Sequence, residues 1–353
     1  MGALNVELLR ALCETPAVPG HEDRVRELIE REVEDLFDEV RVDALGSLLC
    51  RRDARKGKAK SKGKPPTKVM LLCHMDEIGF LVRHVGEQGF IYLQPVGGFD
   101  PRNLFSRRVL VCTAQGDLKG VMNPGGKPIH ISSPEDRKKV PEVGEFFVDV
   151  GLGKETKDVV KVGDMVVMDE PFVEMGDKLV SKALDNRVAC WLGIEAVRGL
   201  GKTRHAAEIH VAFTAQEEVG LRGARTAAYG VRPDIGIGVD TTLACDTPGV
   251  PEQDRITVQG EGFGLHVRDS SFIADKALVA EIEALAVQKK IPFQRTMLAA
   301  GGQDGAAAQQ VAAGARAVAI VVGTRYIHTV TEMVDKRDLE AARDILVAYL
   351  AAT

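Results

Sequence analysis

The sequence predicts an α/β protein interrupted by a β-rich insertion. Short apolar runs of strand character alternate with amphipathic helical patterns in the first and last parts of the chain. Between about residues 82 and 171 the pattern changes to short strand-like pieces, many Gly and Pro turns and no long helical period. A chain of 353 residues also exceeds what one hydrophobic core usually fills, so either two domains or one large domain with an insertion is expected.

Composition excludes several classes of protein. No apolar run approaches the roughly 20 residues of a membrane span, and the N-terminus lacks a basic-then-apolar signal pattern. We therefore expect a soluble, cytoplasmic protein with no membrane partner. A net charge of -5 gives no overall attraction to nucleic acid. The six cysteines are scattered without CxxC spacing, which predicts reduced, buried thiols rather than disulfides or a zinc–thiolate site.

The first elements are packing elements. Helical periodicity covers residues 3–13 and again about 21–37, with apolar residues on one face. Strand-like residues 39–43 and 47–50 flank a short turn. The run 51–68 follows, with nine Lys or Arg and a single Asp. It is typical of a nucleic-acid arm or of a solvated loop, and the loop is favoured because the run has no aromatic residue for base stacking. We assign it no function.

The first candidate site follows a buried strand at residues 68–73. The strand ends in His74, and Asp76 comes two residues later. Side chains two apart in extended backbone face the same way, so the Asp76 carboxylate can accept the imidazole N–H and fix which nitrogen faces a metal. A single His after a strand can equally be structural.

Two adjacent carboxylates, Glu217 and Glu218, follow the strand-like run 209–213. In open α/β sheets ligands bind at the carboxyl ends of the strands. Neighbouring side chains point in different directions, so one carboxylate can bind a metal while the other handles protons. The alternative is structural, because Thr214 and Glu217 also have the spacing of a helix capping box.

The same pattern of strand followed by a donor residue recurs along the chain. Asp185 follows a strand-like stretch and precedes a helix to about residue 198, although it can also be a helix N-cap. Asp240 ends the run 234–239, and His328 lies beyond the run 317–322. The remaining expected elements are a loop at 250–271, a helix at 272–289, a strand at 292–295, a helix at 305–313 and a closing helix from Arg337.

Five hard donors thus lie at or just beyond strand ends: His74, Asp185, Glu218, Asp240 and His328. Imidazole nitrogen and carboxylate oxygen suit Zn²⁺, with Co²⁺ or Mn²⁺ as substitutes, and the set can hold two ions with one aspartate bridging them. Two such ions lower the pKa of a bridging water. Glu217 remains free to act as a base.

Motifs around these donors carry a family resemblance over nearly the whole chain. They are HMDEIGF at 74–80, KALDNR at 182–187, QEEVG at 216–220, VD at 239–240 and RYIH at 325–328. The chain resembles the tetrahedral (TET) and glutamyl aminopeptidase family of dinuclear, co-catalytic zinc metallopeptidases. The resemblance implies that His74 and His328 are terminal metal ligands, that Asp185 bridges, and that Glu218 and Asp240 each bind one ion. It also implies that Glu217 is the general base and that Asp76 orients His74.

The same resemblance implies the architecture. A mixed-sheet α/β/α metallopeptidase catalytic domain would comprise residues 1–81 and 172–353. A small, β-rich, barrel-like dimerisation domain would occupy residues 82–171. Members of the family commonly form homododecameric, tetrahedral particles built from dimers, so self-association is expected.

The predicted activity is release of N-terminal amino acids from short peptides. Residues near the expected site are uncharged, which favours neutral or apolar N-terminal side chains, and Arg295 is the nearby cation that would favour acidic ones. The uncharged residues are Thr241, Thr242, Leu243, Met297, Leu298 and Ala299. Alternatives are a related metal-dependent deacylase or carboxypeptidase-like hydrolase, and a metal-stabilised scaffold or binding protein. The scaffold is disfavoured because structural metal sites are closed and need no spare Glu217.

Overall fold

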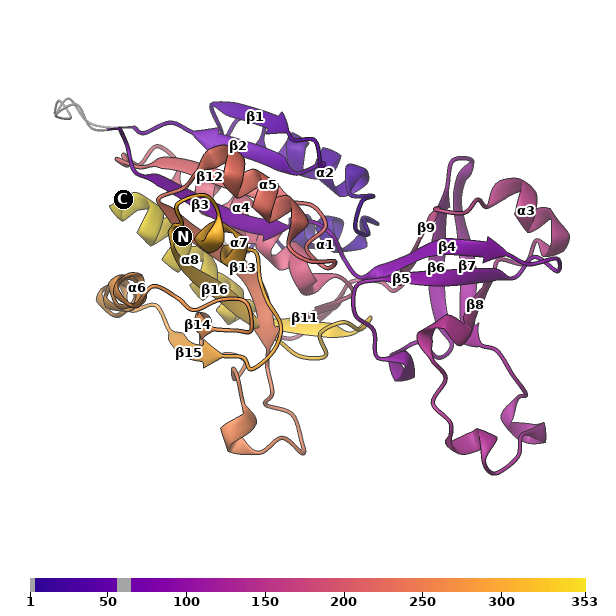
Figure 1. Ribbon diagram of the computed structural model, residues 1–353. Coiled ribbons are helices and arrows are strands. Elements are labelled where there is room, and N and C mark those ends of the chain that lie inside the picture. The colour runs from indigo at the N-terminus through magenta and orange to yellow at the C-terminus, as the bar shows by residue number, and fades with distance from the viewer. Residues whose placement is uncertain (1–3, 56–64) are drawn as a thin grey trace.

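A computed structural model describes residues 4–55 and 65–353 and consists of an α/β part and a closed β-barrel (Figure 1). Half of the basic run, residues 56–64, lies outside the described residues. The described ends of the run connect to strand β2 (Leu48–Arg52) on one side and to strand β3 (Lys68–His74) on the other. No helix in the described ranges combines the length and apolar character needed to cross a membrane.

The α/β part is built on an eight-stranded mixed sheet in the order β1-β2-β12-β3-β13-β16-β14-β15. Neighbours β12, β3, β13 and β16 are parallel, so their carboxyl ends meet at one edge of the sheet. Strands β1 and β2 are antiparallel at one side, and β14 is antiparallel to β16 at the other. Bounds not yet given are β1 Glu39–Val42, β12 Glu208–Thr214, β13 Ile235–Leu243, β14 Phe263–Arg268, β15 Phe293–Met297 and β16 Arg316–Thr324.

Helices cover both faces of this sheet because its central strands carry apolar side chains on both faces. In β3, Leu71 and Cys73 belong to the larger hydrophobic cluster, whereas Met70 and Leu72 belong to the cluster on the opposite face. The larger cluster packs against α1 Val6–Glu14, α2 Asp23–Val33, α4 Leu184–Leu200, α6 Lys276–Lys289 and α8 Lys336–Ala352. The smaller cluster packs against α5 Arg222–Val231 and α7 Gly305–Gln310.

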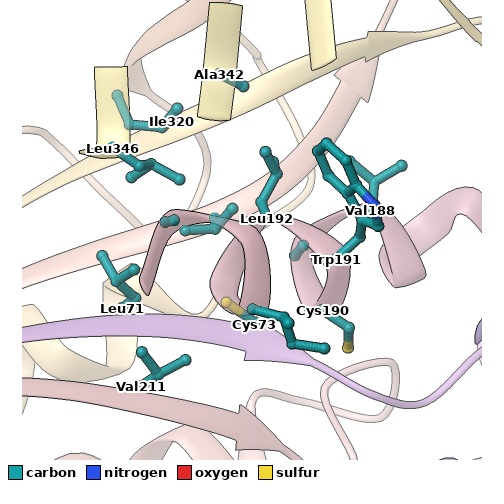
Figure 2. Packing of buried hydrophobic residues seen from close by; sticks show 14 of the residues in the cluster. Leu71, Cys73, Val188, Cys190, Trp191, Leu192, Val211, Ile320, Ala342 and Leu346 are labelled. Atoms are coloured by element: carbon teal, nitrogen blue, oxygen red, sulfur yellow. The ribbon is translucent and has the colours of Figure 1, made fainter. Parts of the chain in front are cut away.

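Helix α4 forms the centre of the larger layer (Figure 2). It contacts β3 and β13 on one side and α8 on the other. Trp191 is 1% exposed, and its indole N–H donates to the main-chain carbonyl of Asn5 at 2.9 Å. Helix α4 therefore packs between the central strands of the sheet and α8.

The inserted region is a closed barrel in the order β4-β5-β8-β7-β6-β9. Its strands are β4 Gly79–Val85, β5 Ile91–Val96, β6 Arg107–Thr113, β7 Gly116–Pro124, β8 Phe146–Asp149 and β9 Met165–Met168. The four-residue α3 (Thr156–Val159) and 3-10 turns lie in its connections. The α/β class and the β-rich insertion are thus confirmed. The first barrel strand begins three residues before position 82, and assigning 82–171 to a dimerisation domain stays a prediction.

The barrel packs directly on the α/β part. Val18 clusters with Cys112, Met165 and Val167 of the barrel. Gly79 opens β4 at this junction, where a Cβ atom would lie 2.4 Å from Val18 Cγ1, so only glycine permits the contact.

A third, three-stranded sheet was not predicted. It comprises β10 Val173–Met175, β11 Lys178–Ser181 and β17 Glu332–Asp335, in the order β10-β11-β17. Strand β10 is exposed along its whole length and therefore lacks an apolar alternation. Strands β10 and β11 lead the chain from the barrel into α4, whereas β17 begins four residues after His328.

Several predicted boundaries were wrong. The expected loop at 250–271 contains β14, where Gly264 lies so close to β16 that a Cβ atom would be 2.5 Å from Val321 Cγ2. Glycine lowers strand propensity, which hid this strand from the sequence pattern. The helix expected from residue 272 begins at Lys276, because the Asp275 carboxylate accepts the N–H of Leu278 and caps it there. The helices expected at 21–37 and 305–313 are shorter, at 23–33 and 305–310.

Candidate metal centre

The predicted donor residues converge at the carboxyl edge of the parallel strands. His74 is the last residue of β3 and pairs with Thr214, the last residue of β12, so Glu217 and Glu218 follow beside it. Asp240 lies within β13, the next strand on the other side of β3. Asp185 and His328 reach the same place from the start of α4 and from beyond β16.

His74 and His328 face opposite oxygens of the same carboxylate. His74 Nε2 lies 3.3 Å from Asp185 Oδ1, and His328 Nε2 lies 3.5 Å from Asp185 Oδ2. Around His74 Nε2 are also Asp240 Oδ1 at 4.0 Å and Glu217 Oε2 at 3.8 Å. Glu218 Oε1 lies 3.4 Å from His328 Nε2. The site thus has two halves that share Asp185.

The geometry groups the donors into overlapping sets of three. Donor atoms of His74, Asp185 and Glu218 all lie within 4.8 Å of one another, as do those of His74, Glu217 and Asp240. Carboxylate oxygens and imidazole nitrogens without a thiolate are a donor set that Zn²⁺, Co²⁺ and Mn²⁺ accept. The residues present therefore fit divalent cations.

Electrostatics support the same conclusion. Burial by itself lowers the pKa of an imidazole, yet Asp185 and Glu218 outweigh burial and raise the pKa of His328 to about 11. For His74 burial also opposes the charge, and Glu217 and Asp185 raise its pKa well above the ordinary value. Burial raises the pKa of Asp240 well above its usual range, and nearby Asp185 adds to this. The protein alone thus favours positive charge in the site.

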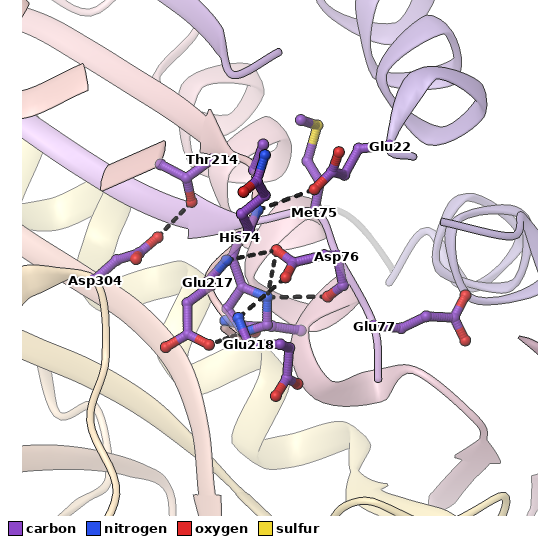
Figure 3. A network of polar contacts seen from close by, with 12 residues as sticks. Glu22, His74, Met75, Asp76, Glu77, Thr214, Glu217, Glu218 and Asp304 are labelled. Atoms are coloured by element: carbon purple, nitrogen blue, oxygen red, sulfur yellow. Dashed lines mark hydrogen bonds and ion pairs between the residues drawn. The ribbon is translucent and has the colours of Figure 1, made fainter. Parts of the chain in front are cut away.

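Asp76 approaches His74 through its carbonyl as well as its carboxylate (Figure 3). Its main-chain carbonyl lies 3.0 Å from His74 Nδ1, and its carboxylate Oδ1 lies 3.6 Å from the same nitrogen. A carbonyl only accepts, so Nδ1 carries the proton and Nε2 is free to bind a metal. The Asp76 carboxylate also accepts the main-chain N–H groups of Glu217 and Glu218, both at 3.0 Å. Asp76 therefore orients the two-glutamate turn directly and His74 through its backbone.

The structural alternatives for two donor residues are wrong. Helix α5 begins only at Arg222, and the Thr214 hydroxyl donates to Asp304 instead of capping a helix. Asp185 has extended backbone angles (φ -82°, ψ 104°) and is not the N-cap of α4, a position held by Ala183. Glu217 thus lies in the turn before α5, and Asp185 lies at a non-helical position in the first turn of α4, both at the edge of the sheet.

Sequence reasoning missed a buried ion cluster behind the donors. Lys182 Nζ lies 2.8 Å from both carboxylate oxygens of Glu77, and Arg187 Nη2 lies 3.2 Å from one of them. Arg187 also donates to the main-chain carbonyl of Met75 at 2.8 Å. Figure 3 shows Glu77 pointing away from His74. The cluster joins the segment after His74 to the segment around Asp185. In the sequence, the one indication of this cluster is that its residues lie within the motifs that contain His74 and Asp185.

Asp304 and Glu332 were also missed. Asp304 is buried, accepts from Thr214, and has its pKa raised to about 6, mainly by burial. Glu332 is buried and accepts main-chain N–H groups from Asp185 and His328. The one sequence signal for Glu332 is its position four residues after His328.

A cavity of about 930 Å³ opens over the donors. Five of the six uncharged residues predicted near the site line it, and Met297 does not: the five are Thr241, Thr242, Leu243, Leu298 and Ala299. Arg295 pairs with Glu283 of α6 and is not a lining residue. The charged residues of the lining away from the donors are Arg225 and Asp254. The space next to the donors is thus mostly neutral.

An α/β sheet with hard donors converging at its carboxyl edge, beside an open cavity, defines a metal-dependent hydrolase. Residues 56–345 match the M42 glutamyl aminopeptidase family. The chain belongs to this family, which confirms the resemblance seen in the motifs, and it is a metal-dependent aminopeptidase.

Individual proteins agree with this assignment. The lysyl aminopeptidase of Pyrococcus furiosus is 29% identical over 98% of this chain and 96% of its own length. An aminopeptidase from the archaeon Desulfurococcus kamchatkensis is 33% identical and superposes with a TM-score of 0.91, covering 99% of this chain and 94% of the other. The TET1 peptidase of Pyrococcus horikoshii is 28% identical, with a TM-score of 0.85 over 98% of both chains, and can assemble into a tetrahedron or a large octahedral shell.

Proposed function

We propose that this enzyme releases neutral or apolar N-terminal amino acids from short peptides, with two divalent ions in the site and Glu217 as the general base. One observation carries the proposal: the two oxygens of Asp185 face two different imidazoles, His74 and His328. A carboxylate placed in this way is suited to bridge two ions. Zn²⁺ is the expected metal, with Co²⁺ or Mn²⁺ as substitutes.

Each half of the site supplies three donors. His74, Asp185 and Asp240 would hold one ion, and Asp185, Glu218 and His328 the other. Bound divalent ions lower the pKa of a water molecule and polarise the scissile carbonyl. Glu217 would be left outside both sets of ligands, although it lies close to His74.

Glu217 is suited to move protons. Burial raises its pKa well above the ordinary value, and Asp304 and Asp240 add to this against the opposing effect of His74. A carboxylate with a raised pKa accepts a proton from water readily and returns it to the leaving amine. The main-chain N–H groups of Glu217 and Glu218 each donate to the Asp76 carboxylate, which fixes the turn from which Glu217 projects. We assign Glu217 both transfers.

The substrate class follows from charge and lining. The carboxylates of the site favour a cationic amino terminus over an acylated, neutral one. The lining residues Leu243, Ile256 and Leu298 favour an apolar first side chain. Asp254 at the same cavity would favour a basic side chain, and Arg225 an acidic one, so these two residues define the competing specificities.

The test is hydrolysis of aminoacyl-nitroanilides of Leu, Met, Ala, Glu and Lys, together with N-acetyl-Leu, after metal removal and reconstitution with Zn²⁺, Co²⁺ or Mn²⁺. We expect metal-dependent cleavage of free amines only, with Leu or Met ahead of Lys and Glu. Faster cleavage of Lys or Glu would overturn the apolar preference and point to Asp254 or Arg225. Cleavage of N-acetyl-Leu alone would identify a deacylase, and silence with metal bound would favour a scaffold.

We also infer that the chain forms a homododecamer built from dimers in the cytoplasm. The assembly is supported by the tetrahedron of the TET1 peptidase. All six cysteines are free thiols, as is usual in a reducing compartment. Sedimentation should give twelve times the 38.1 kDa chain mass. A stable monomer at micromolar concentration would contradict the assembly without affecting the chemistry of the site.

A further inference from the structure

We propose that Glu332 is a positioning residue of the metal centre, which sets the spacing of Asp185 and His328 by accepting a main-chain N–H from each. The inference rests on the proposed ligand set. Glu332 Oε2 accepts the N–H of Asp185 at 3.0 Å, and Oε1 accepts the N–H of His328 at 2.7 Å. One carboxylate thus joins two residues that lie far apart in sequence.

The place of Glu332 in the fold makes this link rigid. It is the first residue of β17 and pairs with Ser181, the last residue of β11. The side chain is buried, with 2% exposure for the whole residue. Strand β11 leads directly toward Asp185, so the small sheet and the Glu332 carboxylate together fix the approach of that segment.

The two ligand segments need such support because regular structure does not hold them. His328 has a φ of 63°, in the left-handed region that residues with side chains rarely adopt. Asp185 has extended angles at the start of a helix. Their main-chain N–H groups therefore lack the usual helical or ladder partners, and Glu332 supplies one acceptor to each.

The chemistry of the contact distinguishes positioning from packing. Both carboxylate oxygens accept hydrogen bonds, so a glutamine of nearly the same size would turn an NH₂ donor toward a main-chain N–H. Glu332→Gln therefore preserves volume and breaks one link. Glu332→Asp keeps two acceptors on a stem that is shorter by one methylene, so it should retain part of the effect.

The opposite end of the same strand offers a matched control. Asp335 is buried and pairs with Lys178 at 2.5 Å and Arg337 at 2.8 Å, and neither of these residues is a proposed metal ligand. Asp335→Asn weakens β17 and the start of α8 without touching Asp185 or His328. This variant therefore shows how far destabilisation of the three-stranded sheet by itself changes Co²⁺ binding.

The experiment compares wild type, E332Q, E332D and D335N, each metal-stripped and titrated with Co²⁺ against a competing chelator. We expect E332Q to bind the weaker of two Co²⁺ ions about 10- to 100-fold less tightly, with altered visible absorption, as supporting hydrogen bonds to ligands usually matter to this extent. On Leu-nitroanilide its kcat should fall more than its KM changes. E332D should lie between E332Q and wild type, and D335N should lower Tm while keeping the Co²⁺ affinity and spectrum.

Wild-type Co²⁺ affinity and spectrum in E332Q would overturn the proposal, and so would an equal change in D335N. If E332Q does not fold, E332D decides, since unchanged Co²⁺ binding there would contradict the spacing role. The Co²⁺ affinity, the visible spectrum and Tm are measured without any substrate. A wild-type protein that binds Co²⁺ normally but cleaves no peptide would therefore refute the proposed function and leave the test of Glu332 intact.

Discussion

The barrel and the α/β part bury very different side chains. Between Gly79 and Met168, which the structure describes throughout, the buried polar side chains are Thr113 and Thr156, and none is charged. The α/β part buries charged or titratable groups around its site, among them Asp76, Lys182 and Asp304. One region is held by apolar packing, whereas the other combines packing with buried charge.

This difference follows from what each region does. A buried charge is costly unless it is paired, hydrogen-bonded or bound to a metal. None of the proposed metal ligands lies in the barrel, and its interior is apolar. The α/β part concentrates negative charge that only cations can balance fully. We therefore expect substitutions in the two regions to separate stability from metal binding.

The largest effect should come from Glu217→Gln. Removing a general base lowers turnover by about 10²- to 10⁴-fold. Metal content should stay at the wild-type level because Glu217 lies outside the proposed ligand sets. Metal analysis and kcat on Leu-nitroanilide measure the two quantities. Loss of metal together with activity would make Glu217 a metal ligand and contradict its role as the general base.

Next in size is Glu77→Gln in the buried ion cluster. Lys182 and Arg187 would then lose their carboxylate partner, and breaking a buried pair typically costs about 3–5 kcal/mol of stability. Because the cluster joins the segments that carry His74 and Asp185, metal affinity should fall as well. Urea unfolding and a Co²⁺ titration test both effects. Reduced stability with unchanged Co²⁺ affinity would show that the ion cluster does not affect the geometry of the metal ligands.

Phe146→Ala is the matching change in the barrel. Phe146 is fully buried in the barrel core, so truncation should cost up to about 3–5 kcal/mol through lost packing and a cavity. Activity and metal content per folded molecule should remain those of the wild type. A drop in Co²⁺ affinity as large as that of Glu77→Gln would contradict the separation between the two regions.

Metal removal should destabilise the protein moderately and make its stability depend on pH. A ligand at 100 times its Kd stabilises by about 2.7 kcal/mol. In the metal-free protein the folded pKa of His328 is about 11, because Asp185 and Glu218 stabilise its protonated form, whereas the ordinary pKa of a histidine is 6.5. The protonated imidazole therefore contributes full stability below pH 6.5, and that contribution is lost as pH rises toward 11. Tm of chelated protein should fall from pH 6.5 to 10, whereas metal-loaded protein should show a smaller decline.

The smallest effect should come from Arg24→Ala. Arg24 joins α2 to the barrel through two contacts with Asp117, at 2.6 and 2.7 Å. Both side chains are partly exposed, so the pair contributes at most about 1 kcal/mol. Urea unfolding at low and high salt measures it. A loss comparable to that of Phe146→Ala would mean that this ion pair, rather than the Val18 contact, holds the barrel in place.

Much of the fold could be predicted because its signals are local. Buried parallel strands are continuous apolar runs, and the donors that follow them are single residues at the ends of those runs. What escaped prediction depends on contacts between distant segments. The pairing of Glu77 with Lys182 and of Glu332 with Asp185 has no local pattern, and Gly264 concealed β14 because its close contact with β16 excludes a side chain. For Asp76, residue spacing indicated the neighbour His74, but it could not show that the Asp76 carbonyl also reaches His74 or that its carboxylate accepts the N–H groups of Glu217 and Glu218.

The order of the donors along the chain has a consequence for biosynthesis. The barrel is one uninterrupted stretch between His74 and Asp185, whereas the last donor in sequence, His328, comes 160 residues after the last barrel strand ends at Met168. Domains generally fold as they leave the ribosome, N-terminal parts first. The barrel can therefore close while Asp185 and the later donors are still unmade. A nascent chain that has not yet reached His328 lacks the complete donor set and so has no assembled metal centre.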